Sequence, residues 1–171
     1  ATSASDSPGA ETTGCGGYTA VTPSRLLDTR GTTGPVGSAT VTLPVSVPAD
    51  AVGVQLDVSA VEATGPGFLR VGPAGSTPTT TALSFGTGRS TTGLVTTTAD
   101  GARQVTVTVL GTPVNLVVDV LGYFGTGGAQ WHPVTPARVA DTRTGQGLAQ
   151  HPLPGPPVDL DLTGYVPSTA T

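Results

Sequence analysis

The chain is poor in charge and in aromatic side chains, and it has neither lysine nor methionine. Charged residues are 11% of its 171 positions, and the seven basic residues are all arginines. The formal net charge is −4 and no basic stripe is present, which argues against a nucleic-acid binder. No apolar run approaches the roughly 20 residues of a membrane-spanning helix, so no membrane span is predicted.

Cysteine is almost absent too, because Cys15 is the only one. An intrachain disulfide is therefore impossible. The thiol is expected either to be inert or, in an oxidising compartment, to pair with a second chain. It lies in a small, polar N-terminal tail, residues 1–17, that shows no periodicity. The sequence opens on small residues such as signal-peptide cleavage leaves behind, and we expect a secreted protein.

Threonine and valine are abundant, and 25 glycines and 16 prolines accompany them. Because β-branched residues favour strands and Gly and Pro favour turns, this composition indicates strands joined by short turns. In the run 52–61 the side chains of Val52, Val54, Leu56 and Val58 fall on one face. Strand-like runs are found at 40–47, 52–61, 68–71, 79–85, 93–98, 103–110 and 114–124.

The runs 93–98 and 103–110 flank Ala99-Asp100-Gly101, and an Asp-Gly turn between strands predicts a hairpin. In all, about seven strands are expected, without a helical period. The predicted fold is all-β, an antiparallel β-sandwich of the jelly-roll or immunoglobulin-like type.

An internal repeat is the most informative feature that is present. Residues 22–30 read TPSRLLDTR and residues 135–143 read TPARVADTR, with six identities in nine positions. The residues ahead of them also correspond, since Tyr18 stands where Trp131 stands. Val166-Pro167-Ser168 further echoes Val47-Pro48-Ala49. A spacing this large is a whole small domain and not a solenoid unit.

The repeat predicts the domain organisation. We expect a polar tail over 1–17, a β-sandwich module over 18–124 and a linker over 125–130. An incomplete second repeat over 131–171 then forms an arm, with a strand at Val158–Thr163. An incomplete module must pack on something, which is expected to be either a neighbouring chain or its own first module.

Three segments together resemble the "P-x-R-x-L-D-T-R" modules of secreted actinobacterial proteins. They are TPSRLLDTR, the GFLRVGP run at 67–73 and the VVDVLGYF run at 117–124. The resemblance spans about 18–124 and restarts over 131–171. It implies a secreted, surface-associated β-module without an established catalytic activity. The second copy has Ala140 where such modules prefer leucine.

The densest charged groups are Arg25, Asp28 and Arg30, and their repeat Arg138, Asp141 and Arg143. Asp and Thr side chains bond nearby backbone amides, and Arg forks onto a carboxylate. Each group is interpreted as a structural latch closing one end of the sandwich, with a ligand-binding loop as the alternative. Asp119 lies in a strongly apolar strand and is expected to pair with an arginine. Asp57 and Glu62 are expected at the surface.

The aromatic residues Tyr18, Trp131 and Tyr165 are candidates for an interface or for stacking on sugars. Two histidines, one distant cysteine and scattered carboxylates do not make a zinc site. No catalytic residue, no cofactor and no metal ligand is therefore predicted.

These features predict a non-catalytic, secreted structural subunit at the cell surface. It would assemble with copies of itself into a filament or array by adding its arm to a neighbour's sheet edge. The alternative is a module that binds cell-wall or extracellular polysaccharide through the Arg/Asp clusters and the aromatic residues. A fragment of a longer tandem-repeat protein would give the same sequence.

Overall fold

The computed structural model describes residues 16–130, 136–148 and 158–166. The chain divides into two compact units, residues 1–130 and residues 131–171. All eight strands of the described ranges belong to the first unit, and these ranges contain no helix. Accordingly, nothing in them forms a helix long and apolar enough to cross a membrane.

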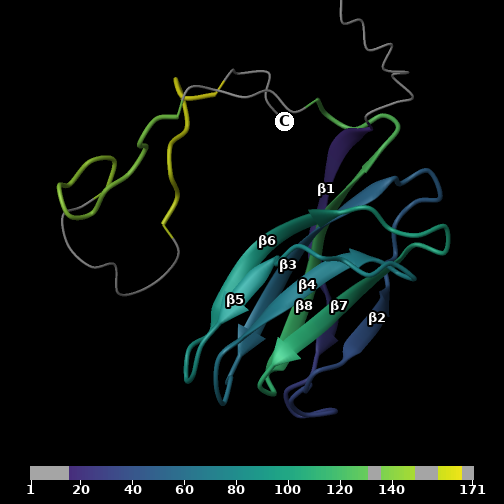
Figure 1. Ribbon diagram of the computed structural model, residues 1–171. Helices are drawn as coiled ribbons and strands as arrows, with labels where there is room; N and C mark the ends of the chain where they lie inside the picture. The colour runs from purple at the N-terminus through teal and green to yellow at the C-terminus, as the bar shows by residue number, and fades with distance from the viewer. Residues whose placement is uncertain (1–15, 131–135, 149–157, 167–171) are drawn as a thin grey trace, which may run out of the picture. The chain divides into compact units, whose positions relative to one another are not determined.

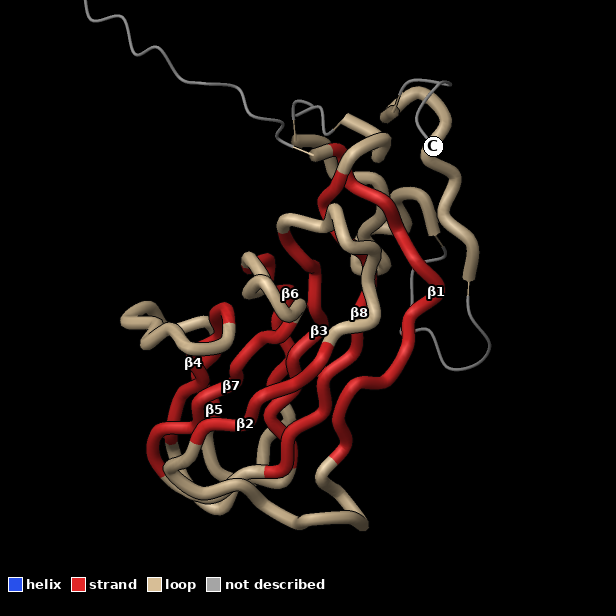
Figure 2. The backbone as a smooth tube through the Cα atoms, turned by 90° about the vertical axis from the view of Figure 1, so that its right-hand side faces the viewer, coloured by secondary structure: helices blue, strands red, loops and turns tan. Residues whose placement is uncertain are grey.

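The eight strands form two antiparallel four-stranded sheets (Figures 1 and 2). The strands are β1 (Gly17–Asp28), β2 (Thr40–Pro44), β3 (Gly53–Val61), β4 (Gly67–Pro73), β5 (Leu83–Phe85), β6 (Thr91–Thr97), β7 (Gln104–Gly111) and β8 (Asn115–Gly125). The first sheet has the order β1-β8-β3-β6, and the second has the order β2-β7-β4-β5. The prediction of an all-β sandwich is confirmed.

The strand order identifies the sandwich as a jelly roll. Only β4 and β5 pair with each other as sequence neighbours, and every other connection crosses from one sheet to the other. Eight strands arranged in this way make the two interlocked Greek keys of a jelly roll. An immunoglobulin-like sandwich has seven or nine strands in other orders. As a result β1 and β2, the first strands of the chain, lie at the edges of their respective sheets.

The core lies between the sheets and is built from the inward faces of alternating strands. Val54, Leu56 and Val58 of β3 are fully buried, as the period of two predicted. The valines of β7 at 105, 107 and 109 face them from the second sheet, also buried. Leu69, Leu116 and Val118 fill the same cluster. Val52 is an exception to the prediction, because it precedes β3 and its residue is 55% exposed.

The predicted hairpin between 93–98 and 103–110 is wrong. The two runs do form β6 and β7, but β6 pairs with β3 and β7 pairs with β2 and β4. Asp100 shapes the connection between the sheets. Its Oδ1 accepts the N–H groups of Ala102 at 3.1 Å and Gln104 at 2.6 Å, and Arg103 takes a positive φ of 58°. The turn therefore directs the chain across the sandwich.

The second unit forms local turns. Asp141 and Gln146 pair in an isolated antiparallel bridge, and Tyr165 and Val166 both donate backbone N–H groups to Leu162 O. The strand predicted over Val158–Thr163 is not formed, since only Thr163 makes a bridge, with Val166. An isolated strand leaves its backbone groups without partners, and no other strand is described in this unit.

Candidate functional site

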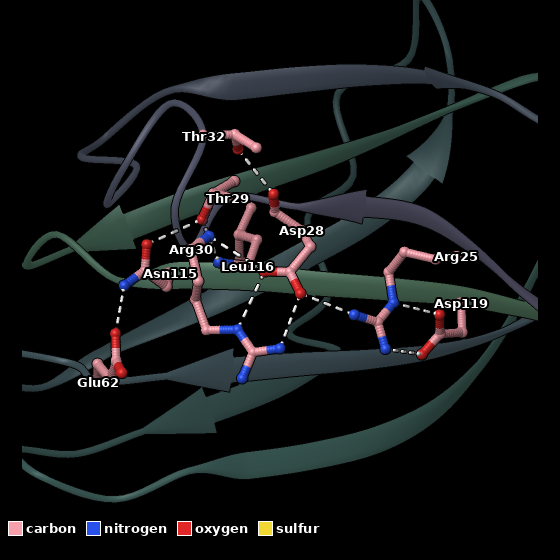
Figure 3. Close-up of polar contacts among 9 residues, drawn as sticks. All are labelled: Arg25, Asp28, Thr29, Arg30, Thr32, Glu62, Asn115, Leu116 and Asp119. Atoms are coloured by element: carbon pink, nitrogen blue, oxygen red, sulfur yellow. Dashed lines mark hydrogen bonds and ion pairs between the residues drawn. The ribbon is translucent and has the colours of Figure 1, made fainter.

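The first cluster comprises Arg25, Asp28 and Arg30, and its centre is the carboxylate of Asp28 at the end of β1 (Figure 3). Asp28 Oδ1 accepts hydrogen bonds from the backbone N–H and from Nε of Arg30, both at 3.0 Å. Asp28 Oδ2 lies 2.7 Å from Arg30 Nη2 and 2.7 Å from Arg25 Nη1. One carboxylate thus binds two guanidinium groups and fixes the turn that follows β1.

Arg25 joins this cluster to the neighbouring strand, β8. Its Nε lies 2.5 Å from Asp119 Oδ1, and its Nη2 donates to Asp119 Oδ2 at 3.2 Å (Figure 3). Arg25 and Asp119 are opposite each other in the register of the two strands. The prediction that Asp119 pairs with an arginine is confirmed. Such a fork fixes geometry as well as charge, and it anchors edge strand β1 to the sheet.

The charges of the first cluster shift one another's pKa values in the direction of ionisation. Hydrogen bonding from the Arg30 side chain is the main cause that lowers the pKa of Asp28, from 3.8 to about 2. The hydrogen bond to Asp119 raises the pKa of Arg25, and that to Asp28 raises the pKa of Arg30. Near neutral pH these groups hold their charges firmly, which suits ion pairing and not proton transfer.

A buried polar chain that the sequence analysis missed continues from this cluster into the sandwich. The N–H of Leu116 donates to Thr29 Oγ1 at 2.9 Å, and Thr29 Oγ1 donates to Asn115 Oδ1 at 3.0 Å. Asn115 Nδ2 then donates to Glu62 Oε2 at 2.7 Å (Figure 3). Glu62 is exposed, as predicted, with a positive φ of 56°. Thr29 is 1% exposed, so its hydroxyl connects the end of β1 to the start of β8.

Tyr18 makes a further contact between β1 and β8. A Cβ added to Gly122 would overlap the Tyr18 ring, so the ring lies directly on this glycine. The hydroxyl donates to Leu121 O at 3.2 Å, and the ring stands tilted at 5.3 Å from that of Phe124. This half-buried ring packs on its own module, and the glycine of the VVDVLGYF run is the space that receives it.

The second cluster comprises Arg138, Asp141 and Arg143, and it repeats the geometry of the first. Arg143 donates from its backbone N–H and from Nε to Asp141 Oδ1, both at 3.0 Å. Asp141 Oδ2 lies 2.7 Å from Arg143 Nη2 and 2.6 Å from Arg138 Nη1. Hydrogen bonding from Arg143 lowers the pKa of Asp141. Because the two copies lie in different units, the motif R-x-x-D-T-R determines this geometry locally.

The two copies differ in the groups that contact β8 in the first. Arg25 donates from Nε and Nη2 to Asp119, whereas Nε and Nη2 of Arg138 form no hydrogen bond or ion pair with another described side chain. The side chain of Arg138 is 61% exposed. Thr29 forms hydrogen bonds with Asn115 and Leu116, whereas within the described ranges the hydroxyl of Thr142 makes no such bond. Among the described residues, therefore, the second cluster has no counterpart of the contacts that β8 makes with the first.

The remaining predicted residues do not gather into one site. Tyr165 is 41% exposed in the second unit. Asp57 lies opposite Asp119 in the register of β3 and β8, and it is half-buried, with Oδ1 enclosed and unpaired. Where the structure describes the chain, no three His, Cys, Asp or Glu residues stand close enough to hold a metal ion. Cys15 and Trp131 lie outside the described residues.

Comparison with known proteins gave no match to a protein family and none to a curated protein sequence.

Proposed function

We propose that this chain is a non-catalytic, secreted structural subunit of a cell-surface assembly, joined to its neighbours through residues 131–171. The first unit supplies a rigid jelly roll with a closed core. The second unit supplies the segment that docks on the sheet edge of another subunit. Repetition of this contact from one subunit to the next builds a filament or an array.

The observation that carries the proposal is a stretch of exposed apolar side chains in the second unit. Within the described residues, seven large hydrophobic side chains are exposed, and five of them fall in the nine residues 158–166. They are Val158, Leu160, Leu162, Tyr165 and Val166, each 41–49% exposed. A short segment with this much apolar surface is typical of a binding element that its partner covers.

The spacing of these side chains indicates how the segment binds. Val158, Leu160 and Leu162 alternate with Asp159 and Asp161, as in a strand with one apolar face. The echo of Val47-Pro48 at Val166-Pro167 aligns this segment with β2 and its two inward residues, Val41 and Leu43. An edge strand added to a sheet gains backbone hydrogen bonds and buries such a face.

The proposal is tested on the full chain by light scattering after size exclusion and by negative-stain electron microscopy. We expect regular oligomers or fibres, and we expect the pair Leu160→Ser and Leu162→Ser to disperse them. Leu94→Ser is the matched control, since Leu94 is 64% exposed on the sandwich itself. Monomers at all concentrations, or equal effects of the Leu94 and Leu160/Leu162 substitutions, would contradict the proposal.

A further inference from the structure

We infer that residues 136–143 are a recognition element for strand β8 of a second copy of this chain. In the contact, Arg138 takes the place of Arg25 on Asp119, and Thr142 takes the place of Thr29 beside Asn115. The inference rests on the proposed function and specifies its contact. The second copy's own β1 leaves β8, and residues 136–143 of the first copy occupy its position.

Arg138 and Thr142 supply the groups for this contact, and their spacing matches that of Arg25 and Thr29. Arg25 and Thr29 are four residues apart, as are Arg138 and Thr142. In the first unit this spacing reaches from Asp119 to Asn115 along β8. The Arg138 guanidinium is already oriented by Asp141 in the same way that Arg25 is oriented by Asp28. The remaining donors of Arg138 are Nε and Nη2. In Arg25 the same two atoms donate to Asp119 of β8.

The partner follows from the chemistry of these groups. A forked guanidinium pairs best with a carboxylate. A threonine hydroxyl four residues later can donate to an amide oxygen and accept from a backbone N–H. Strand β8 offers this set in its run N-L-V-V-D, with Asn115 at one end and Asp119 at the other. No second N-L-V-V-D run occurs in the sequence. The donor and the acceptor are thus parts of the same chain, which gives a head-to-tail contact between copies.

Strand β1 is bound to β8 through Arg25 and Thr29, but other features of the strand favour its exchange. It lies at a sheet edge, and eleven of its twelve residues are exposed or half-buried. Its pairing with β8 is interrupted by two register shifts. Val21, Leu26 and Leu27 are its only side chains packed on the core. The segment 136–143 has the smaller residues Val139 and Ala140 in place of Leu26 and Leu27. In a free subunit, β1 is therefore the better partner of β8.

A local turn in the second unit also restrains the exchange. Gln146 Nε2 donates to the carbonyl of Arg138 at 2.7 Å, and Asp141 donates its backbone N–H to Gln146 O at 2.8 Å. These backbone groups must open before residues 136–143 can pair with a strand. Gln146→Ala removes the side-chain restraint and should increase exchange, as should Ala140→Leu, which restores an apolar side chain.

The test weakens the pairing of β1 with β8 and measures whether residues 136–143 of another chain replace β1. Arg25→Asp places a carboxylate against Asp119, so residues 136–143 of another chain should replace β1. The protein is unfolded, refolded and analysed by native mass spectrometry with mixed isotope labels. We expect the dissociation constant for self-association to fall about tenfold to hundredfold, as a forked ion pair allows. Adding Arg138→Asp should reverse this gain.

The matched control is Arg25→Asp with Arg89→Asp, which has the same net charge as Arg25→Asp with Arg138→Asp. Arg89 is exposed on the first unit, and its substitution should leave association intact. The variant with Arg25→Asp and Arg138→Asp could fail to fold, and Asp119→Arg is then added to it. The arginine at position 119 gives β1 and residues 136–143 the same opposite charge to pair with. Folding and association should then recover together, and failure to recover would contradict the inference.

The outcomes separate this inference from the proposed function. The inference alone is overturned if Arg25→Asp does not strengthen assembly. It is also overturned if Arg138→Asp weakens assembly no more than Arg89→Asp does. Exchange confined to single chains, without mixed-label oligomers, overturns it as well. A full chain that never assembles overturns the proposed function together with it.

Discussion

Replacing Gly122 by alanine should destabilise the sandwich through Tyr18, and the effect should change sign once Tyr18 is removed. The added methyl group would overlap the Tyr18 ring, which lies on this glycine. The ring must then move away from β8. Its hydroxyl loses the hydrogen bond to Leu121 O, and the ring loses its tilted contact with Phe124.

The magnitude follows from these two contacts. An aromatic pair contributes about 0.5–1.5 kcal/mol, and a hydrogen bond contributes about 0.5–1.5 kcal/mol. Alanine in a strand gains about 0.5–1 kcal/mol over glycine in backbone entropy. The net loss of unfolding free energy for Gly122→Ala therefore lies between about 0 and 2.5 kcal/mol, with a central value of about 1 kcal/mol. With Tyr18→Ala already present, only the entropic gain remains, so Gly122→Ala should be neutral or stabilising.

The assay is a double-mutant cycle by urea unfolding, followed by circular dichroism. Gly86→Ala is the control, because a Cβ at Gly86 would meet nothing within 4 Å. The cycle should give a coupling energy of about 1–3 kcal/mol between the two sites. Equal effects of Gly122→Ala with and without Tyr18 would refute the packing of the ring on this glycine.

Three further outcomes follow from the fold. Thr29→Val should lower the free energy of unfolding in urea by about 1–3 kcal/mol, because two buried polar groups lose their partner. Thr142→Val should lower it by less than about 0.5 kcal/mol. Equal losses would contradict the buried hydrogen-bond chain through Thr29. The folded pKa of Asp28 is lowered from 3.8 to about 2, so its contribution to stability is present above about pH 4 and lost as the pH falls through 2. Asp28→Asn should therefore reduce the fall in thermal stability between pH 4 and pH 2, and an unchanged fall would contradict this. Leu69→Ala, at a fully buried position, should cost about 2–5 kcal/mol, against less than about 0.5 kcal/mol for Leu94→Ala, and calorimetry measures both.

The sequence predicted the buried faces of the sandwich and seven of its eight strands better than it predicted their pairing, and β1 was not predicted. Val54, Leu56 and Val58 alternate with polar residues, and burial on one face follows directly from this period. The pairing of β6 and β7 was predicted wrongly because an Asp-Gly turn favours a hairpin locally. Here Asp100 Oδ1 instead accepts the N–H groups of Ala102 and Gln104, and Arg103 takes a positive φ, so the turn leads β6 and β7 into different sheets.

The candidate site was predicted in part. The repeat located both Arg-Asp-Arg clusters, and the apolar setting of Asp119 predicted its arginine partner. Thr29 was missed because one threonine in a threonine-rich chain has no distinguishing local pattern, although its identity with Thr142 was a usable signal. The strand predicted at Val158–Thr163 was wrong for a different reason, since an alternating pattern requires a neighbouring strand to complete its hydrogen bonds.

Hydrogen exchange of the full chain at low and high protein concentration tests the central claim most directly. The account predicts that amides of residues 136–148 and 158–166 gain protection as the concentration rises, because these segments pair with the sheet edge of another copy. Amides of β3, in the centre of the first sheet, should remain equally protected throughout. If residues 136–148 and 158–166 exchange equally fast at both concentrations, the second unit is not an assembly element and the account is wrong.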